Sequence, residues 1–336
     1  MDQTDPDLTF NKHGVCNYCQ DAFAKANDRR AERLERPWII HQAKTNKKYD
    51  VLLGLSGGVD SSYTLHCLLE SKLRPYTFSL DNDENTPEAN HNIKNLVQKT
   101  GVDHEVVKID LGKYHELQKA FVLSGVSNIE IPTDHILMAV TYRMAKKKKI
   151  RTVVGGGNWQ TESIMPKAWG YEPKDLTHIK AIYKRFIGKR LKGLPTISLP
   201  GYIWNRFVRR IKIVNLLDYY DYNRRDAIQT LVERYDFKPY GEKHGESKFT
   251  KWFQDYYLPV KFGYDKRKPH LSSMIHSGQI TRDEALEELA QPLKTKEKYY
   301  SYIKSPNKTY KDYPNSEYWW DLASKLWQRS AVLRRH

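Results

Sequence analysis

A short apolar run that leads into a glycine-rich turn and then into a helix constrains this chain most. Residues 49–55 read YDVLLGL, which has the length and composition of a buried strand. Residues 56–62 read SGGVDSS, and a helical pattern follows from Tyr63. Glycines allow backbone angles that a Cβ would forbid, so the amides of such a turn can point at an anion. The dipole of the following helix adds to this attraction, and the stretch therefore predicts a phosphate-binding loop.

The spacing of this loop separates it from two better-known phosphate loops. It lacks the G-x-x-x-x-G-K-[ST] pattern of a Walker A motif and the G-x-G-x-x-G pattern of a dinucleotide-binding fold. It resembles the S-G-G-x-D-S loop of the PP-loop ATP pyrophosphatases, which hold the pyrophosphate end of ATP and transfer AMP to a carbonyl oxygen. The resemblance implies ATP and Mg²⁺ as cofactors, a catalytic role for Asp60, and nucleotide binding by Ser56, Gly57, Gly58, Asp60, Ser61 and Ser62. The alternative is an ordinary Ser/Gly turn, which the strand before it and the helix after it disfavour.

Strand and helix patterns alternate at short spacing after the loop. We expect strands at 76–80, 104–109 and 151–155, and helices at 87–100, 112–123 and 131–149. This alternation predicts an α/β fold, a doubly wound parallel sheet with a mostly helical C-terminal region. The carboxyl ends of such strands face one crevice. We therefore expect Asp81 and Asn82 to bound the adenosine, and Gly156 and Gly157 to approach the nucleotide closely.

Four regions are predicted along the 336 residues. They are an N-terminal CxxC segment with a basic helix (1–48), an ATP pyrophosphatase domain (49–163), an insertion with a helical substrate or partner region (164–295), and a basic aromatic tail (296–336). We expect 165–214 to be helical or irregular, and 218–237 to form a pair of helices. Thr281 and Glu284 have the spacing of a capping box.

Composition restricts the cellular setting and the partners. The chain has no run of about eighteen apolar residues and no signal-peptide core, so we expect a cytoplasmic protein without membrane insertion. The net charge of +16 favours polyanionic partners, but it does not distinguish RNA from a nucleotide sugar.

The three cysteines give no disulfide framework. Cys16 and Cys19 form a CxxC, which in a cytosolic chain is either half of a metal knuckle or a redox pair, with His13 as a conceivable third ligand. Zn²⁺ binding therefore remains one interpretation of Cys16 and Cys19. Cys67 follows the phosphate loop on an apolar helix face, which is more typical of a core residue than of a nucleophile.

The stretch from Tyr240 onward is dense in acids, bases and aromatic residues and carries a more specific resemblance. Residues 241–250 read GEKHGESKFT, and 256–273 read YYLPVKFGYDKRKPHLSS. These runs resemble the N-acetyl sugar amidotransferases, PP-loop enzymes of surface-polysaccharide and sialic-acid-like sugar biosynthesis. Residues 5–10 (DPDLTF), residues 14–19 (GVCNYC) and the pair Gly157–Asn158 are similar to the same family.

The resemblance implies an ATP-dependent conversion of a sugar acetamido group to an acetamidino group. ATP would adenylate the amide oxygen, and ammonia from a partner glutaminase with a cyclase-like channel subunit would displace AMP. The sugar, free or nucleotide-linked, would belong to lipopolysaccharide, O-antigen or a related surface glycan. We expect Lys243, His244 and Glu246 to join Asp60 in contacting the sugar or the pyrophosphate, and a purely structural polar cluster is the alternative for these three residues. Members of this family usually carry another CxxC upstream, so we expect either a truncated start at Met1 or a lineage that has lost the zinc.

Two other functions compete with this reading. A tRNA-modifying PP-loop enzyme, of the thiolase or lysidine-synthetase type, is favoured by the net charge and the CxxC. Thiolation, however, needs a sulfur-carrying cysteine or a cluster near the loop, and no cysteine follows Cys67, so we expect no nucleic-acid partner. A non-catalytic nucleotide-binding scaffold is the third reading, and the complete Ser56–Ser62 loop argues against it.

Overall fold

A five-stranded parallel sheet organises the computed structural model, which describes residues 1–170, 172–240, 245–293, 307–308 and 310–316. The strands are β1 (Val51–Gly54), β2 (Pro75–Asp81), β3 (His104–Lys108), β4 (Thr152–Gly155) and β5 (Lys212–Asn215), in the order β3-β2-β1-β4-β5. Every pair is parallel, and Leu53 of β1 lies between Thr77 of β2 and Val154 of β4. The predicted fold class is confirmed by this strand order.

Helices cover both faces of the sheet, as alternate strand residues require. Val51 and Leu53 point toward α3 (Val59–Glu70), α4 (Pro87–Thr100) and α10 (Arg224–Tyr235), where they join one apolar cluster. Leu52 points to the other face, which packs against α5 (Leu111–Ser124), α6 (Ile131–Lys148) and α8 (Leu176–Ile187). Because all three residues are fully buried, the sheet is doubly wound with a core on each face.

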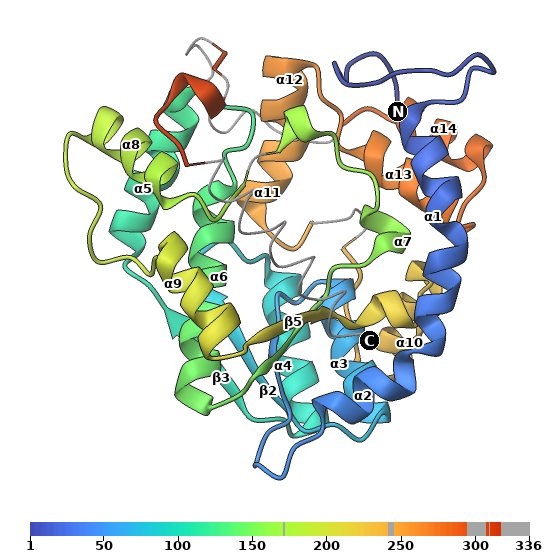
Figure 1. Cartoon of the computed structure of the whole chain (residues 1–336), viewed down its shortest axis with the longest axis vertical. Coiled ribbons are helices and arrows are strands. Elements are labelled where there is room, and N and C mark those ends of the chain that lie inside the picture. The colour runs from blue at the N-terminus through green and yellow to red at the C-terminus, as the bar shows by residue number, and fades with distance from the viewer. Residues whose placement is uncertain (171, 241–244, 294–306, 309, 317–336) are drawn as a thin grey trace.

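The N-terminal and C-terminal parts of the chain pack together beside the sheet (Figure 1). Helix α1 (Asn17–Leu34) contacts α13 (Arg267–His276), and α13 contacts α7 (Trp159–Glu162), which follows β4. The remaining helices are α2 (Arg36–Ala43), α9 (Leu199–Ile203), α11 (Lys248–Trp252), α12 (Leu258–Phe262) and α14 (Arg282–Ala290). No helix in the described ranges is long and apolar enough to cross a bilayer.

Several local predictions are confirmed. The helix over 87–100 has the predicted bounds and ends at Gly101, whose φ of 65° is left-handed. Thr281 and Glu284 form the predicted capping box at the start of α14.

Two local predictions from the sequence are wrong. The stretch 165–214 contains β5, a four-residue edge strand whose side chains are largely exposed. Its apolar run, residues 211–214, is short and interrupted by Lys212, so periodicity alone does not distinguish a strand from a helix there. The expected helix pair at 218–237 is a 3-10 turn over Leu216–Tyr219 followed by the single helix α10. The predicted C-terminal tail lies mostly outside the described residues.

We expect Gly57→Ala to destabilise the protein by roughly 2 kcal/mol or more, because two costs combine at this position. Gly57 has a φ of +77°, and a Cβ there would lie 2.3 Å from the carbonyl oxygen of Ala89. Urea unfolding monitored by circular dichroism measures this change. Gly112→Ala is the matched control, since Gly112 lies in α5 with its nearest neighbour 3.5 Å from an added Cβ. Equal midpoints for the two variants would show that the loop tolerates a side chain.

Candidate active site

The phosphate loop lies between the end of β1 and the start of α3, as the sequence predicts. Ser56 and Ser61 contact each other through their hydroxyl oxygens at 3.1 Å, and the Gly58 amide donates to Ser56 Oγ at 3.2 Å. The loop is therefore held in shape by its own serines. Ser62 Oγ is buried and has no hydrogen-bond partner in the described part of the chain, and Ser62 does not line the cavity beside the loop.

Two tyrosines and a carboxylate from distant segments lie over this loop. The Val59 amide at the start of α3 donates to the Tyr240 hydroxyl at 2.9 Å, and the Tyr222 hydroxyl donates to Asp60 Oδ1. Burial and the charge of Asp60 raise the pKa of Tyr222, so its hydroxyl remains a donor. A Cβ on Gly58 would lie 2.8 Å from Glu246 Oε1, which shows how closely Glu246 approaches the loop.

The glycine loop after β4 closes against the phosphate loop. A Cβ on Gly156 would lie 3.0 Å from the Ser61 amide nitrogen, so only glycine permits this approach without a shift. The strand order reverses between β1 and β4, and ligands of open α/β sheets bind at such switch points. The two predicted glycine loops, one after β1 and one after β4, thus meet at the switch point between these strands, where the sequence predicts the nucleotide.

A cavity of about 700 Å³ begins at the phosphate loop and extends across the end of β2. Ser56 and Asn82 line it, and Asn82 donates to the Tyr114 hydroxyl at 3.3 Å. The walls are partly apolar (Phe78, Leu80, Leu137, Met165, Pro166 and Phe253). An apolar cavity with a few polar groups is the usual form of a small-molecule site.

The C-terminal motif predicted from the sequence completes this cavity. Ser247 and Thr250 line it, and the Thr250 hydroxyl donates to Glu130 Oε2 at 2.9 Å. The Ser247 hydroxyl donates to Glu84 Oε2 at 3.4 Å, while the Thr86 amide donates to the Glu246 carbonyl at 2.9 Å. The motif is therefore anchored to the β2–α4 loop and to the start of α6.

Four charged groups in the cavity wall were not predicted. Burial raises the pKa of Glu84, and burial with the charge of Asp134 raises the pKa of Glu130 to about 8. Burial also raises the pKa of Asp134 to about 6, although its carboxylate is open to water within the cavity. Burial lowers the pKa of Lys266 to about 8, against the opposing effect of Asp134 and Glu130.

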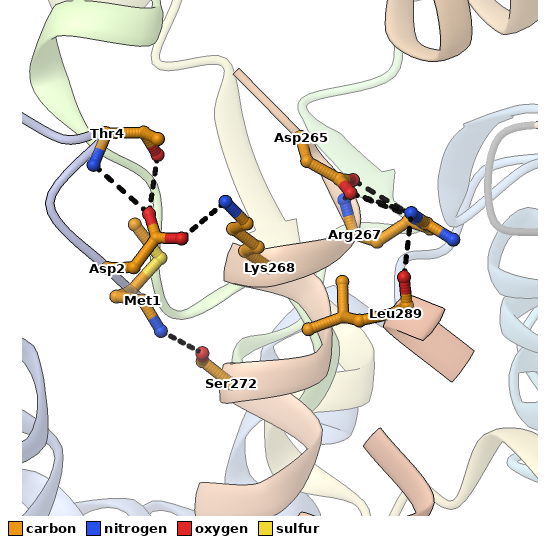
Figure 2. A network of polar contacts seen from close by, with 8 residues as sticks. All are labelled: Met1, Asp2, Thr4, Asp265, Arg267, Lys268, Ser272 and Leu289. Atoms are coloured by element: carbon orange, nitrogen blue, oxygen red, sulfur yellow. Dashed lines mark hydrogen bonds and ion pairs between the residues drawn. The ribbon is translucent and has the colours of Figure 1, made fainter. Parts of the chain in front are cut away.

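The chain on either side of Lys266 is firmly anchored (Figure 2). The Arg267 guanidinium donates to both oxygens of Asp265 and to the Glu288 carbonyl at the end of α14. Lys268 donates to the Asp2 carboxylate in the N-terminal segment. Lys266 is thereby placed in the cavity wall by contacts to two other parts of the chain.

The other predicted site residues differ in their position relative to the cavity. Asp81 ends β2 opposite Lys108 and does not line the cavity within the described structure, in contrast to Asn82. Gly157 lies against the Asn215 side chain. Lys243 and His244 lie outside the described residues, so their roles stay predictions.

The predicted metal ligands Cys16 and Cys19 lie close together, with their sulfurs 3.3 Å apart. Burial and the hydrogen bond with Cys16 raise the pKa of Cys19 to about 11. Across the described ranges, no cluster of three His, Cys, Asp or Glu side chains could hold a metal ion. These two cysteines alone do not make the four-ligand site of structural zinc.

One signal in the sequence could have revealed the acid pair. Glu130 and Asp134 are four residues apart at the start of a predicted helix, a spacing that puts both on one face. Lys266 had no comparable signal, because its place in the cavity depends on tertiary contacts.

Residues 246–327 match the family model "LPS biosynthesis protein WbpG-like, C-terminal domain". The matched segment includes the C-terminal motifs that carry the resemblance, and the similarity confirmed there is to a domain of a lipopolysaccharide biosynthesis protein. No curated protein sequence matches the chain significantly.

Solved structures similar to this chain are distant. NMN synthetase from Francisella tularensis has 14% identity and a TM-score of 0.35, covering 76% of this chain and 95% of its own. The NH3-dependent NAD synthetase from Campylobacter jejuni has 13% identity and a TM-score of 0.32, covering 76% and 98%. The U34-tRNA thiolase NcsA from Methanococcus maripaludis, with its [4Fe-4S] cluster, has 14% identity and a TM-score of 0.36, covering 90% and 94%. Similarity this low carries no argument about function, and the fold rests on the strand order above.

We expect Cys67 to resist alkylation in the native protein. It is 2% exposed, and burial raises the pKa of its thiol to about 12, so almost no thiolate exists at pH 8. Mass spectrometry after iodoacetamide treatment, with and without urea, measures this. Rapid labelling without urea would contradict the assignment of Cys67 to the core.

Proposed function

We propose that this chain is an ATP-dependent amidotransferase that converts the N-acetyl group of a sugar to an acetamidino group for a lipopolysaccharide or related surface glycan. The observation that carries the proposal is the single cavity shared by the phosphate loop and the WbpG-like segment. Ser56 of the phosphate loop lines one end of this cavity, and Ser247 and Thr250 of the WbpG-like segment line it as well. A nucleotide on the loop would face whatever that segment binds.

The residues around the loop fit the pyrophosphate end of ATP. Ser56, Gly57 and Gly58 lie before a helix N-terminus, where backbone amides and the helix dipole attract anions. Asp60 and Glu246 are the carboxylates beside the loop, and together with ATP phosphates and water they suit Mg²⁺, which would neutralise charge on the leaving pyrophosphate.

Adenylation solves the chemical difficulty of the reaction. An amide is a poor electrophile, because its oxygen is a poor leaving group. Attack of the amide oxygen on the α-phosphorus of ATP releases pyrophosphate, and the oxygen then leaves as part of AMP. The loop stabilises the negative charge that develops on pyrophosphate, which is the usual source of the largest catalytic effect.

Ammonia would come from a partner glutaminase with a cyclase-like channel subunit. Cys67 is buried in the core, so it does not supply the nucleophile that glutamine hydrolysis needs. An ammonium salt should therefore replace the partner in a test with the purified chain, whereas glutamine should not.

The test is pyrophosphate release with ATP, Mg²⁺, an ammonium salt and a panel of free and nucleotide-linked N-acetylated sugars. We expect one sugar to change mass by the exchange of O for NH. Asp60→Asn should lower the rate by about 10²-fold or more, because it removes a carboxylate ligand of the Mg²⁺ that would neutralise the leaving pyrophosphate. Asp283→Asn, an exposed position on α14, is the matched control.

Two results would contradict this proposal. Pyrophosphate release with tRNA but with none of the sugars would favour a tRNA-modifying enzyme. An unchanged rate in Asp60→Asn would show that the chemistry lies elsewhere.

A further inference from the structure

The acid pair at the start of α6 lacks partners for its charge. Glu130 Oε1 is buried and accepts no hydrogen bond within the described residues. The nearby Asp134 carboxylate likewise has no hydrogen bond or ion pair among them, apart from the longer-range attraction of Lys266. Both residues line the cavity. Glu130 Oε1 is itself covered, whereas Asp134 is exposed, so Asp134 is the acid that a ligand in the cavity can reach.

Lys266 faces the same cavity without neutralising the pair. It is 9% exposed, its nitrogen donates to the Met165 thioether at 2.9 Å, and no carboxylate of the described chain lies within 4.0 Å of it. A thioether is a weak acceptor for a buried ammonium group. A buried lysine, a buried oxygen of Glu130 and an exposed Asp134 in the same cavity wall, none of them paired with another, indicate that a ligand completes the site.

The charge balance indicates a cation as this ligand. The raised pKa values of Glu130 and Asp134 mean that the pair binds protons more readily than ordinary carboxylates, since the charge of Lys266 offsets the effect of burial only in part. A bound monovalent cation would supply that charge. No three carboxylate, imidazole or thiolate groups converge in the described ranges, so the pair does not form a cage for a divalent metal ion.

We propose that Glu130 and Asp134 bind the nitrogen donor as an ammonium ion and take the proton that it loses before attack. The inference rests on the proposed function and assigns the second half of that reaction to the acid pair. Ammonium gives one proton to the pair, and its nitrogen lone pair forms the C–N bond at the adenylated amide carbon. The C–O bond to AMP then breaks, and its electron pair leaves with AMP.

The pair also suits the product of this step. An amidine is protonated at neutral pH, so the reaction turns a neutral amide into a cation. Carboxylates bind such planar cations with two parallel hydrogen bonds, as they bind arginine. Negative charge at this position therefore stabilises the cationic amidine more than the neutral amide. Because the positive charge develops as the amide reacts, the same carboxylates stabilise the transition state more than the ground state.

Ammonium affinity should rise with pH, because a cation favours the ionised forms of both acids. The rise should lie between about pH 6 and pH 8, where Asp134 and Glu130 titrate. The other charged groups of the cavity are Glu84 from the β2–α4 loop, Glu246 before α11, Lys167 after α7 and Lys266 before α13, with Glu162 of α7 acting on Lys266.

A comparison of the reaction rates with ammonium and with hydroxylamine distinguishes a role of the acid pair in ammonium binding from a purely structural role. Ammonium is charged at neutral pH and must lose a proton, whereas hydroxylamine is neutral and needs neither a counter-charge nor a base. With the sugar that gives most pyrophosphate in the panel above, Asp134→Asn should raise the KM for ammonium about tenfold or more. Its rate with hydroxylamine should stay within about threefold of the wild type, which would also show that the variant folds.

Glu130→Gln is the second variant, and Glu233→Gln, exposed on α10, is the matched control. An equal loss with both nucleophiles would overturn the inference. So would a raised KM for the sugar with an unchanged KM for ammonium, since the pair would then bind sugar hydroxyls.

If no sugar in the panel reacts, that result counts against the proposed function alone. A measurement of ammonium binding then tests the ammonium site by itself. Ammonium chloride should raise the Tm more than tetramethylammonium chloride at equal ionic strength, and more at pH 8 than at pH 6. Asp134→Asn should abolish the difference. An equal effect of potassium chloride, or no difference in the wild type, would overturn the ammonium site.

Discussion

The parallel pairing of β1 with β2 on one side and with β4 on the other is the constraint on which the site depends. It brings the carboxyl ends of three strands to one edge. Because the strand order reverses at β1, the loops after β1 and β4 leave a crevice between them. Gly57 and Gly156 allow the close backbone approaches that the crevice needs, the first to Ala89 and the second to Ser61.

A second level of organisation comes from the C-terminal segment. Ser247 and Thr250 donate hydrogen bonds to Glu84 and Glu130, so the segment matched by the WbpG-like family model forms a wall of the cavity at the phosphate loop. This arrangement gives a physical reason for the combination of a shared phosphate loop with a specific C-terminal region. In the function that we propose, the loop would activate an amide with ATP, and the wall would select which amide is presented.

Much of the fold and of the loop could be predicted from the sequence, because their signals are local. The turn at 56–62 and the helix at 87–100 depend on neighbouring residues and on glycine at fixed positions. The acid pair, Lys266 and Tyr222 depend on contacts between distant segments, such as Tyr222 with Asp60. The edge strand β5 was missed for a different reason, since its four residues are too few for periodicity to distinguish a strand from a helix.

The fate of the amide oxygen tests the central claim most directly, because only activation by adenylation moves it to the nucleotide. The reaction would be run with a sugar whose acetyl oxygen is oxygen-18, and the products would be weighed by mass spectrometry. Our account predicts that AMP carries one oxygen-18 atom and that pyrophosphate carries none. Label retained in the sugar product, or found in pyrophosphate, would contradict it.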